Sequence, residues 1–220
     1  METQPAARPR RLTRAERKTQ TREQLLEAAA RVFARKGYAG ASVDDIAEEA
    51  GFTVGALYSN FSGKQELFLA AFERHCDQEL TLVQALLGAD LPFEQQLDAV
   101  GRQLGELDAT HRQWWLLSTE LWLYAQRDPA ARARLAALEA KVRHVIAEAL
   151  QRQAARTGHP LPVPAADLAA AMHALWQGLM RKRLVDPDAV APEAIGTALA
   201  WLHAGAGQPP GQHPRQGGRP

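Results

Sequence analysis

Apolar residues recur at steps of three and four positions along almost the whole chain, and no segment sustains the alternation typical of strands. This spacing gathers apolar side chains on one face of a helix. We therefore predict an all-α protein of about nine helices. Longer helices are expected over about 14–36, 64–87, 93–107, 113–125, 129–156, 165–185 and 192–203. The segment 113–125 is apolar nearly all round, which predicts burial on every side.

Two short helices are expected between residues 42 and 60. Ser42 is a predicted N-cap, and Asp45 three residues later completes a capping box, so a helix should run from Val43 to Ala50 and end at Gly51. Thr53 is the predicted cap of a second helix that reaches about Asn60. Neither is long enough to be stable alone. Two short helices joined by a glycine turn indicate a helix-turn-helix DNA reader, or else a purely structural helical corner.

The charge of the chain is unevenly distributed. The 220 residues carry a net charge of +1, but residues 1–37 hold ten Lys or Arg against four acidic residues, a net charge of +6, and the remaining residues carry −5. A basic end on a nearly neutral protein fits a surface that meets a polyanion, although a solvated basic tail has the same composition.

Several functional classes lack their sequence signals. Cys76 is the only cysteine, so no internal disulfide forms, and it is interpreted as an inert thiol. The chain shows no glycine-rich nucleotide loop, no nucleophile elbow and no metal-binding spacing of its seven histidines. It also lacks a secretory signal and an apolar run long enough to cross a membrane. We expect a cytoplasmic protein that is not an enzyme, with no cofactor, no metal and no membrane partner.

Residues 21–68 resemble the N-terminal domain of the TetR (tetracycline repressor) family. The matching positions are Thr21-Arg22, Leu25-Leu26, Ala28-Ala29, Phe33-Ala34, Gly37-Tyr38, Gly40, Ser42-Val43, Ile46-Ala47, Ala50-Gly51, Thr53, Gly55-Ala56-Leu57-Tyr58, Phe61, Lys64 and Leu67-Phe68. The segment 174–179 resembles the family's eighth helix more loosely. The resemblance implies a basic arm (1–13), a three-helix helix-turn-helix DNA-binding domain (14–63) and a helical effector-binding and dimerisation domain (64–203). Residues 204–220 are rich in Gly and Pro and are predicted to be disordered.

The resemblance also places the helix Thr53–Asn60 in the major groove of double-stranded DNA. The implied DNA-binding residues are Ser42, Val43, Thr53, Val54, Gly55, Ala56, Tyr58, Ser59, Asn60, Lys64 and Arg14. Tyr58 has the family's phosphate-contact position, or is a packed aromatic. This helix contains no Lys or Arg, which excludes bidentate reading of guanine from it. We expect specificity from apolar and small polar contacts and from DNA shape, with phosphate or minor-groove contacts from the arginines of the arm.

Family members bind a small-molecule effector among their middle helices. The candidate ligand-binding residues are Trp114, Trp115, Leu117, Ser118, Glu120, Trp122 and Tyr124, which suit a largely apolar effector. An aromatic stripe at helical spacing is equally an ordinary core. Glu120 in so apolar a segment is expected to meet either an internal arginine or a cationic ligand.

The last two helices are implied to form the homodimer interface. Their candidate interface residues are Leu168, Met172, Leu175, Leu179, Ile195, Leu199 and Leu202. A two-fold dimer predicts a palindromic operator. The expected function is a sequence-specific repressor that is released by its effector, with the helix 64–87 as the lever. A ligand-dependent activator is an alternative. A helical adaptor that binds no DNA is another, but it leaves the basic end and the motif unexplained.

Overall fold

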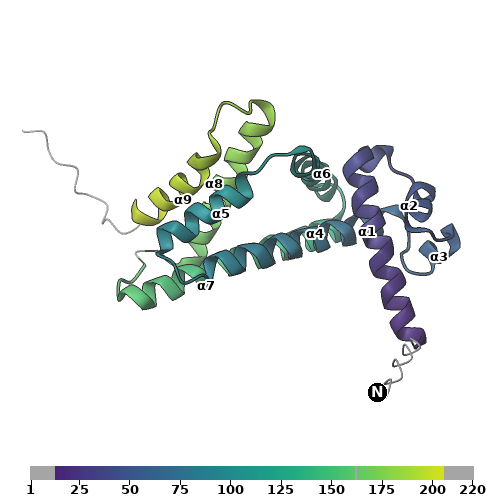
Figure 1. The fold of residues 1–220 in the computed structure, drawn as a ribbon, viewed down its shortest axis with the longest axis horizontal. Helices are drawn as coiled ribbons and strands as arrows, with labels where there is room; N and C mark the ends of the chain where they lie inside the picture. Colours follow the sequence, from purple (N-terminus) through teal and green to yellow (C-terminus); the bar gives the residue numbers. More distant parts are fainter. Residues whose placement is uncertain (1–12, 162, 206–220) are drawn as a thin grey trace, which may run out of the picture. The chain divides into compact units, whose positions relative to one another are not determined.

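The computed structural model describes residues 13–161 and 163–205, which form nine helices and no strand (Figure 1). The all-α prediction is confirmed. The helices are α1 (Arg14–Gly40), α2 (Val43–Ala50), α3 (Val54–Tyr58), α4 (Lys64–Leu87), α5 (Phe93–Gly105), α6 (Ala109–Ala125), α7 (Pro129–Thr157), α8 (Ala165–Val185) and α9 (Pro192–Gly205). None of these helices is both long and apolar enough to span a membrane.

The helix bounds lie within two residues of the predicted ones except at the end of α1 and at the start of α6. α6 begins four residues earlier than predicted because the Asp108 side chain accepts a hydrogen bond from the backbone N–H of His111, at 2.8 Å. α3 ends at Tyr58, two residues before the predicted end. Gly37 was expected to stop the first helix, and its φ of 69° interrupts the helical conformation there.

The chain divides into two compact units, residues up to His75 and residues from Cys76 onward. The first half of α4 belongs to the first unit, whereas the sequence placed the boundary between residues 63 and 64. The physical reason is an aromatic cluster: the ring of Phe68 on α4 lies 5.1 Å from that of Phe33 and 4.7 Å from that of Tyr38. The opening turns of α4 therefore complete the core that α1–α3 begin.

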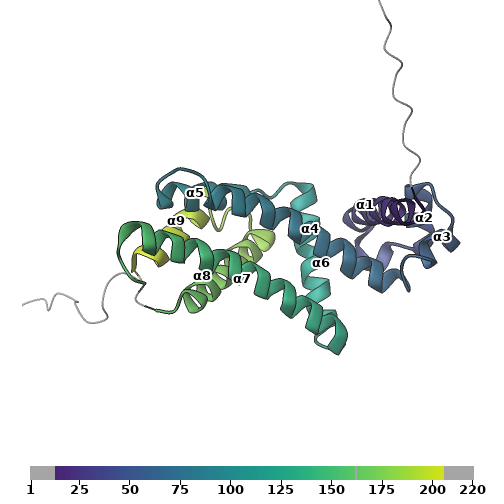
Figure 2. The ribbon, with the colours of Figure 1, turned by 90° about the horizontal axis from the view of Figure 1, so that it is seen from below.

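In the second unit, a hydrophobic core cluster is formed by residues of α4, α5, α7, α8 and α9, and α5 packs most extensively against α9 (Figure 2). Glycine allows this close approach. A Cβ atom added to Gly101 would lie 2.4 Å from the backbone Cα and N of Gly196, and one added to Gly196 would lie 2.9 Å from the Cα of Asp98. The two helices cross with backbone against backbone, a feature that the sequence analysis missed.

Burial lowers the pKa of His173 on α8, so the folded unit favours a neutral ring. The unfolded chain takes up this proton near the ordinary pKa of 6.5. The contribution of the neutral ring to stability is therefore complete above pH 6.5 and is lost as the pH falls below it. We expect the thermal midpoint to decline from pH 7 to pH 5, and less steeply in His173→Gln. Equal slopes for the two proteins would contradict this prediction.

Candidate functional sites

The turn between α2 and α3 is built by local chemistry. The Ser42 hydroxyl accepts a hydrogen bond from the Asp45 N–H, and the Asp45 carboxylate accepts one from the Ser42 N–H, both at 3.0 Å. At the other end of α2, the Phe52 N–H donates to the Ala47 carbonyl at 2.9 Å and Gly51 adopts φ 71°. This left-handed residue turns the chain sharply into α3, as predicted.

α3 is short, and its inner face holds it in place. Leu57 is fully buried, and the Thr53 hydroxyl caps the helix by accepting from the Ala56 N–H at 3.2 Å. The predicted N-cap is confirmed. Isolated, a helix of five residues would not persist, so its packing fixes its direction.

The outer face of α3 is exposed. Thr53, Gly55, Tyr58 and Ser59 are exposed, and Val54 and Ala56 are half-buried. Tyr58 is 55% exposed, which excludes the packed-aromatic alternative within the described residues. The two smallest side chains of the helix thus lie on the side that solvent reaches. We call Val54, Gly55, Ala56, Tyr58 and Ser59, together with Thr53, the reading face.

Three predicted DNA-binding groups are already engaged inside the first unit. The N–H of Ser42, a predicted DNA-binding residue, donates to Asp45. The Asn60 amide donates to the Ala56 carbonyl at 2.9 Å instead of pointing outward from α3. The Lys64 ammonium lies 4.5 Å from the centroid of the Tyr38 ring and 3.5 Å from the Ala39 carbonyl. Local hydrogen bonds compete with an outside ligand at these positions. Val43, also predicted, is half-buried.

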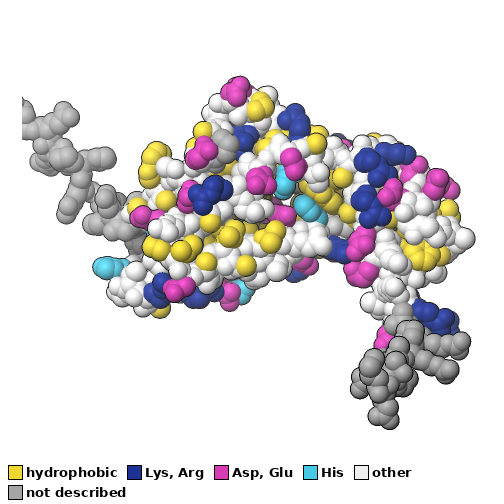
Figure 3. Space-filling model, in the orientation of Figure 1, with side chains coloured by type: hydrophobic (Ala, Val, Ile, Leu, Met, Phe, Trp, Pro, Cys, Tyr) yellow, Lys and Arg dark blue, Asp and Glu magenta, His cyan; other side chains and the backbone are white. Residues whose placement is uncertain are grey.

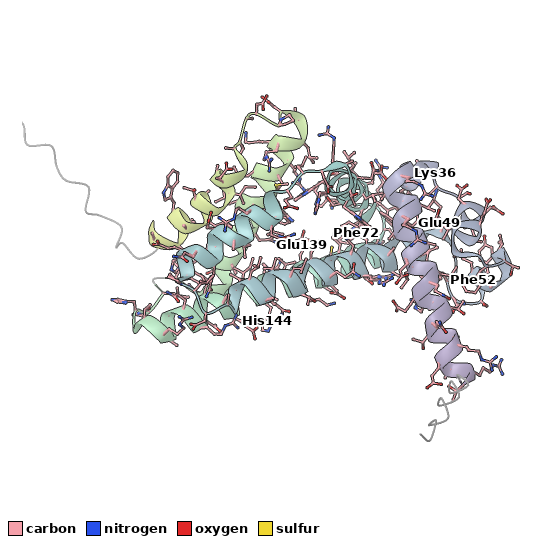
Figure 4. The ribbon with its side chains drawn as sticks, in the orientation of Figure 1. Lys36, Glu49, Phe52, Phe72, Glu139 and His144 are labelled. Carbon is pink, nitrogen blue, oxygen red and sulfur yellow. The ribbon has the colours of Figure 1, made fainter. Side chains whose placement is uncertain are left out.

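Much of the basic charge of the first unit forms ion pairs within it. Arg31 and Arg35 both bind Glu49, at 2.8 and 2.7 Å, and Lys36 binds Asp45 at 2.8 Å (Figure 4). The Lys36 hydrogen bond is the largest cause that lowers the Asp45 pKa to about 2, followed by the hydrogen bonds of Ser42. These cations hold α1 against α2.

The free basic side chains lie at the beginning of α1. Arg14, Arg17 and Lys18 are exposed and have no ion-pair partner among the residues that the structure describes. Figure 3 shows basic side chains at this end of α1, beside the grey residues. The arm that was expected to supply Arg8, Arg10 and Arg11 lies outside the described residues. Arg14 was predicted as a DNA contact, and its two neighbours were not.

Arg22 is a site residue to which the sequence analysis gave no role. Its Nη1 donates to the Asn60 carbonyl at 2.8 Å, and its guanidinium carbon lies 4.1 Å from the centroid of the Phe61 ring. Asn60 and Phe61 lie two and three residues after the end of α3. Arg22 therefore ties α1 to the C-terminal end of the reading face. The one sequence signal that could have identified it is that Thr21-Arg22 is among the positions that match the family's N-terminal domain.

We predict different salt dependences of operator binding for two arginine variants. Arg22→Gln is expected to weaken operator binding about tenfold by loosening α3, while the slope of log affinity against log salt stays unchanged. Arg17→Gln is expected to lower that slope by about one, because a phosphate contact is lost. Fluorescence anisotropy on one operator duplex at several salt concentrations measures both. A reduced slope in Arg22→Gln would instead identify Arg22 as a phosphate contact.

α6 does not gather its predicted ligand-binding residues on one side. Leu116, Trp122 and Leu123 are exposed, so the expectation of burial on every side is wrong for the described chain. The seven candidates are spread around the helix: Trp114 and Leu117 are buried in the core, Trp115, Ser118 and Tyr124 are half-buried, and Glu120 and Trp122 are exposed. Neighbours in sequence point about 100° apart on a helix, which scatters a consecutive run. The exposure of Glu120 removes the premise that it needs a partner in an apolar interior.

The predicted dimer residues are also divided. Leu168, Met172, Ile195 and Leu199 are buried within the core of one protomer, and their place at a dimer interface stays a prediction. Leu175, Leu179 and Leu202 are half-buried. Periodicity identifies an apolar stripe but does not say what covers it. Trp201 on α9 is largely exposed and was not predicted.

Two family models match the chain. Residues 25–71 match the model of bacterial regulatory proteins of the tetR family, and residues 93–205 match the C-terminal model of the BetI-type transcriptional repressor. The second match alone covers more than half of the chain. It includes α5–α9, whereas the resemblance seen in this part of the sequence was loose and confined to residues 174–179.

Individual proteins agree with these models. The chain is 41% identical to the HTH-type transcriptional activator FasR of Mycolicibacterium smegmatis over 98 residues, 44% of each protein, so it spans less than half of that relative's length. It is 29% identical to the HTH-type transcriptional regulator TtgR of Pseudomonas putida, over 84% of this chain and 90% of TtgR.

A crystal structure of a putative TetR-family transcriptional regulator from Rhodococcus sp. superposes with a TM-score of 0.70 at 26% identity, covering 86% of this chain and all of that one. The fold, the helix-turn-helix and the C-terminal helices therefore agree in kind and order with one family of regulators, which are not enzymes. The chain belongs to the TetR family of transcriptional regulators.

Proposed function

We propose that the protein is a homodimeric repressor that binds a palindromic DNA operator through the reading face and leaves it when a small molecule binds the second unit. The observation that carries the proposal is the exposed outer face of α3. Its side chains are uncharged and, apart from Tyr58, small, and its direction is fixed by Leu57, Gly51 and Arg22. Small side chains allow a helix to lie close to base edges in the major groove.

The division of labour between charge and shape supports the same function. Phosphate attraction would come from Arg14, Arg17 and Lys18, which have no ion-pair partner among the described residues. Base reading would come from the reading face, where Val54 and Ala56 offer apolar contacts for a thymine methyl group and Tyr58 a hydroxyl for a phosphate. Such a protein should show strongly salt-dependent binding with selectivity at few base pairs.

The experiment is selection from a random pool of duplexes with the purified full chain, near physiological salt, with competitor DNA and no added ligand. Enrichment of one palindrome would support operator recognition by a dimer. Failure to enrich any sequence would contradict it. Enrichment of single half-sites without two-fold symmetry would contradict the dimer alone.

Activation is the second candidate, and the similarity to FasR, named an activator, is the observation that favours it. The matched C-terminal model, described as that of a repressor, favours repression. A reporter placed behind the selected palindrome distinguishes them. Repression predicts higher expression when the protein is deleted, and activation predicts lower expression.

A further inference from the structure

Arg183 on α8 is the only Lys, Arg, Asp or Glu side chain that is buried in the described part of the chain, with 7% of its surface exposed. A guanidinium keeps its charge at any physiological pH and carries five N–H donors. A buried charge is stable only when it is paired and hydrogen-bonded. Its partners are therefore informative.

Among the described residues, the Arg183 guanidinium has few partners for its charge and its N–H donors. Its Nη1 donates to the carbonyl of Gly105, the last residue of α5, where the ends of α5 and α8 come together (Figure 1). Its Nε is buried and has no described hydrogen-bond partner, and no described carboxylate lies within ion-pair distance. The far more exposed Arg31 and Arg35 both have a carboxylate.

The end of α5 offsets only part of this charge. Carbonyls at a helix C-terminus carry a partial negative charge that favours a cation. One carbonyl nevertheless occupies one edge of the guanidinium. The other edge, formed by Nε and Nη2, holds two parallel N–H groups, which is the geometry that binds both oxygens of a carboxylate.

A second unpaired donor lies on the same face of α8. Trp176 precedes Arg183 by seven residues, two helical turns, and its indole Nε1 is buried without a described hydrogen-bond partner. Met180 between them is fully buried. The centroid of the Trp176 ring lies 5.0 Å from that of the Trp115 ring on α6. The His173 ring stacks on Trp176, with 5.7 Å between their centroids. From Arg183 to Trp176 this row is about 10 Å long.

We propose that this row, Arg183–Met180–Trp176 with Trp115, binds an organic acid, with the carboxylate at the Nε edge of Arg183 and an apolar, ring-bearing body toward Trp176. The inference rests on the proposed function, because it names the chemical class of the effector. Of the seven predicted ligand-binding residues on α6 it keeps Trp115 alone, and it adds the inward face of α8. The adjacent Arg181 and Lys182 are exposed and add positive charge around the same turn.

The test compares three probes that share a phenylbutyl carbon skeleton and differ in the charge and chemistry of the head group: 4-phenylbutyrate, 4-phenylbutanol and 4-phenylbutylamine. Their binding to the full chain without DNA is measured by calorimetry in a phosphate-free buffer. We expect the acid to bind at least about tenfold more tightly than the alcohol and the amine, because a charge-assisted pair forms only with the acid. Equal affinity for acid and alcohol, or no saturable binding of the acid, would overturn the proposal.

Two charge-removing variants on the same turn locate the site. Arg183→Gln keeps a donor for the Gly105 carbonyl and is expected to abolish the preference for the acid without weakening the alcohol. Lys182→Gln, an exposed neighbour, is the matched control and should keep that preference. Equal losses in both variants would show a diffuse charge effect and refute the assignment. Operator binding is measured separately. If the acid does not weaken operator binding, the proposed release by an effector is contradicted. The preference of the protein for the acid over the alcohol alone tests the anion site.

Discussion

Gly101→Ala is expected to lower the free energy of unfolding of the second unit by about 3 kcal/mol, despite the better helix propensity of alanine. The added methyl group would lie 2.4 Å from backbone atoms of Gly196, and backbone cannot rotate away as a side chain can. α5 and α9 must therefore separate. Separation uncovers Leu97 and Ile195, which the crossing now buries. Thermal unfolding followed by circular dichroism measures the loss.

Alanine substitutions at two other glycines give this prediction a scale for comparison. Gly196→Ala meets the Cα of Asp98 at 2.9 Å and should cost less than Gly101→Ala. Gly63→Ala meets no atom within 4 Å and should leave the midpoint unchanged. A Gly101→Ala protein as stable as Gly63→Ala would mean that α5 and α9 do not approach as closely as the structure has them.

The helix-turn-helix was predictable because its signals act over a few residues. The hydroxyls of Ser42 and Thr53 each accept a hydrogen bond from a backbone N–H at a helix start, and Gly51 adopts a positive φ at a helix end. Such chemistry depends on nearest neighbours alone. The structure therefore has each of these residues in its predicted role.

Ser42, before α2, and Asn60, after α3, show where local chemistry misleads. The Ser42 amide and the Asn60 side chain were expected to reach DNA, but each found a partner within three or four residues. A polar group next to a helix end is satisfied first by that end, because the partner is already there. Residue type alone does not distinguish a donor that is free from one that is taken.

Contacts between distant segments were beyond the sequence. Gly101 and Gly196 are separated by 95 residues, and Arg183 meets a carbonyl 78 residues away. Nothing local marks either pair. The same limit explains α6 and the last two helices, where periodicity showed apolar stripes but not whether a core, solvent or a second protomer covers each of them.

Gly55→Leu is expected to weaken operator binding about a hundredfold while leaving the fold intact. In the free protein, a Cβ at this position meets only the Thr53 hydroxyl, at 3.9 Å, so the larger side chain has room. Leucine is also the better helix former, so the thermal midpoint should stay or rise slightly. On DNA, the same side chain would stand between α3 and the base edges and push the reading face out of the groove.

The matching measurement is affinity for a scrambled duplex of equal length. Non-specific binding depends on phosphate contacts, and Arg14, Arg17 and Lys18 are unchanged, so Gly55→Leu should bind the scrambled duplex within about twofold of the unmodified protein. Gly55→Ala adds one methyl group, and its affinity for the operator should lie between those of Gly55→Leu and the unmodified protein. If Gly55→Leu bound the operator normally, α3 would not be the element that reads the bases. If it lost both duplexes equally, the substitution would have displaced the phosphate-binding end of α1 as well.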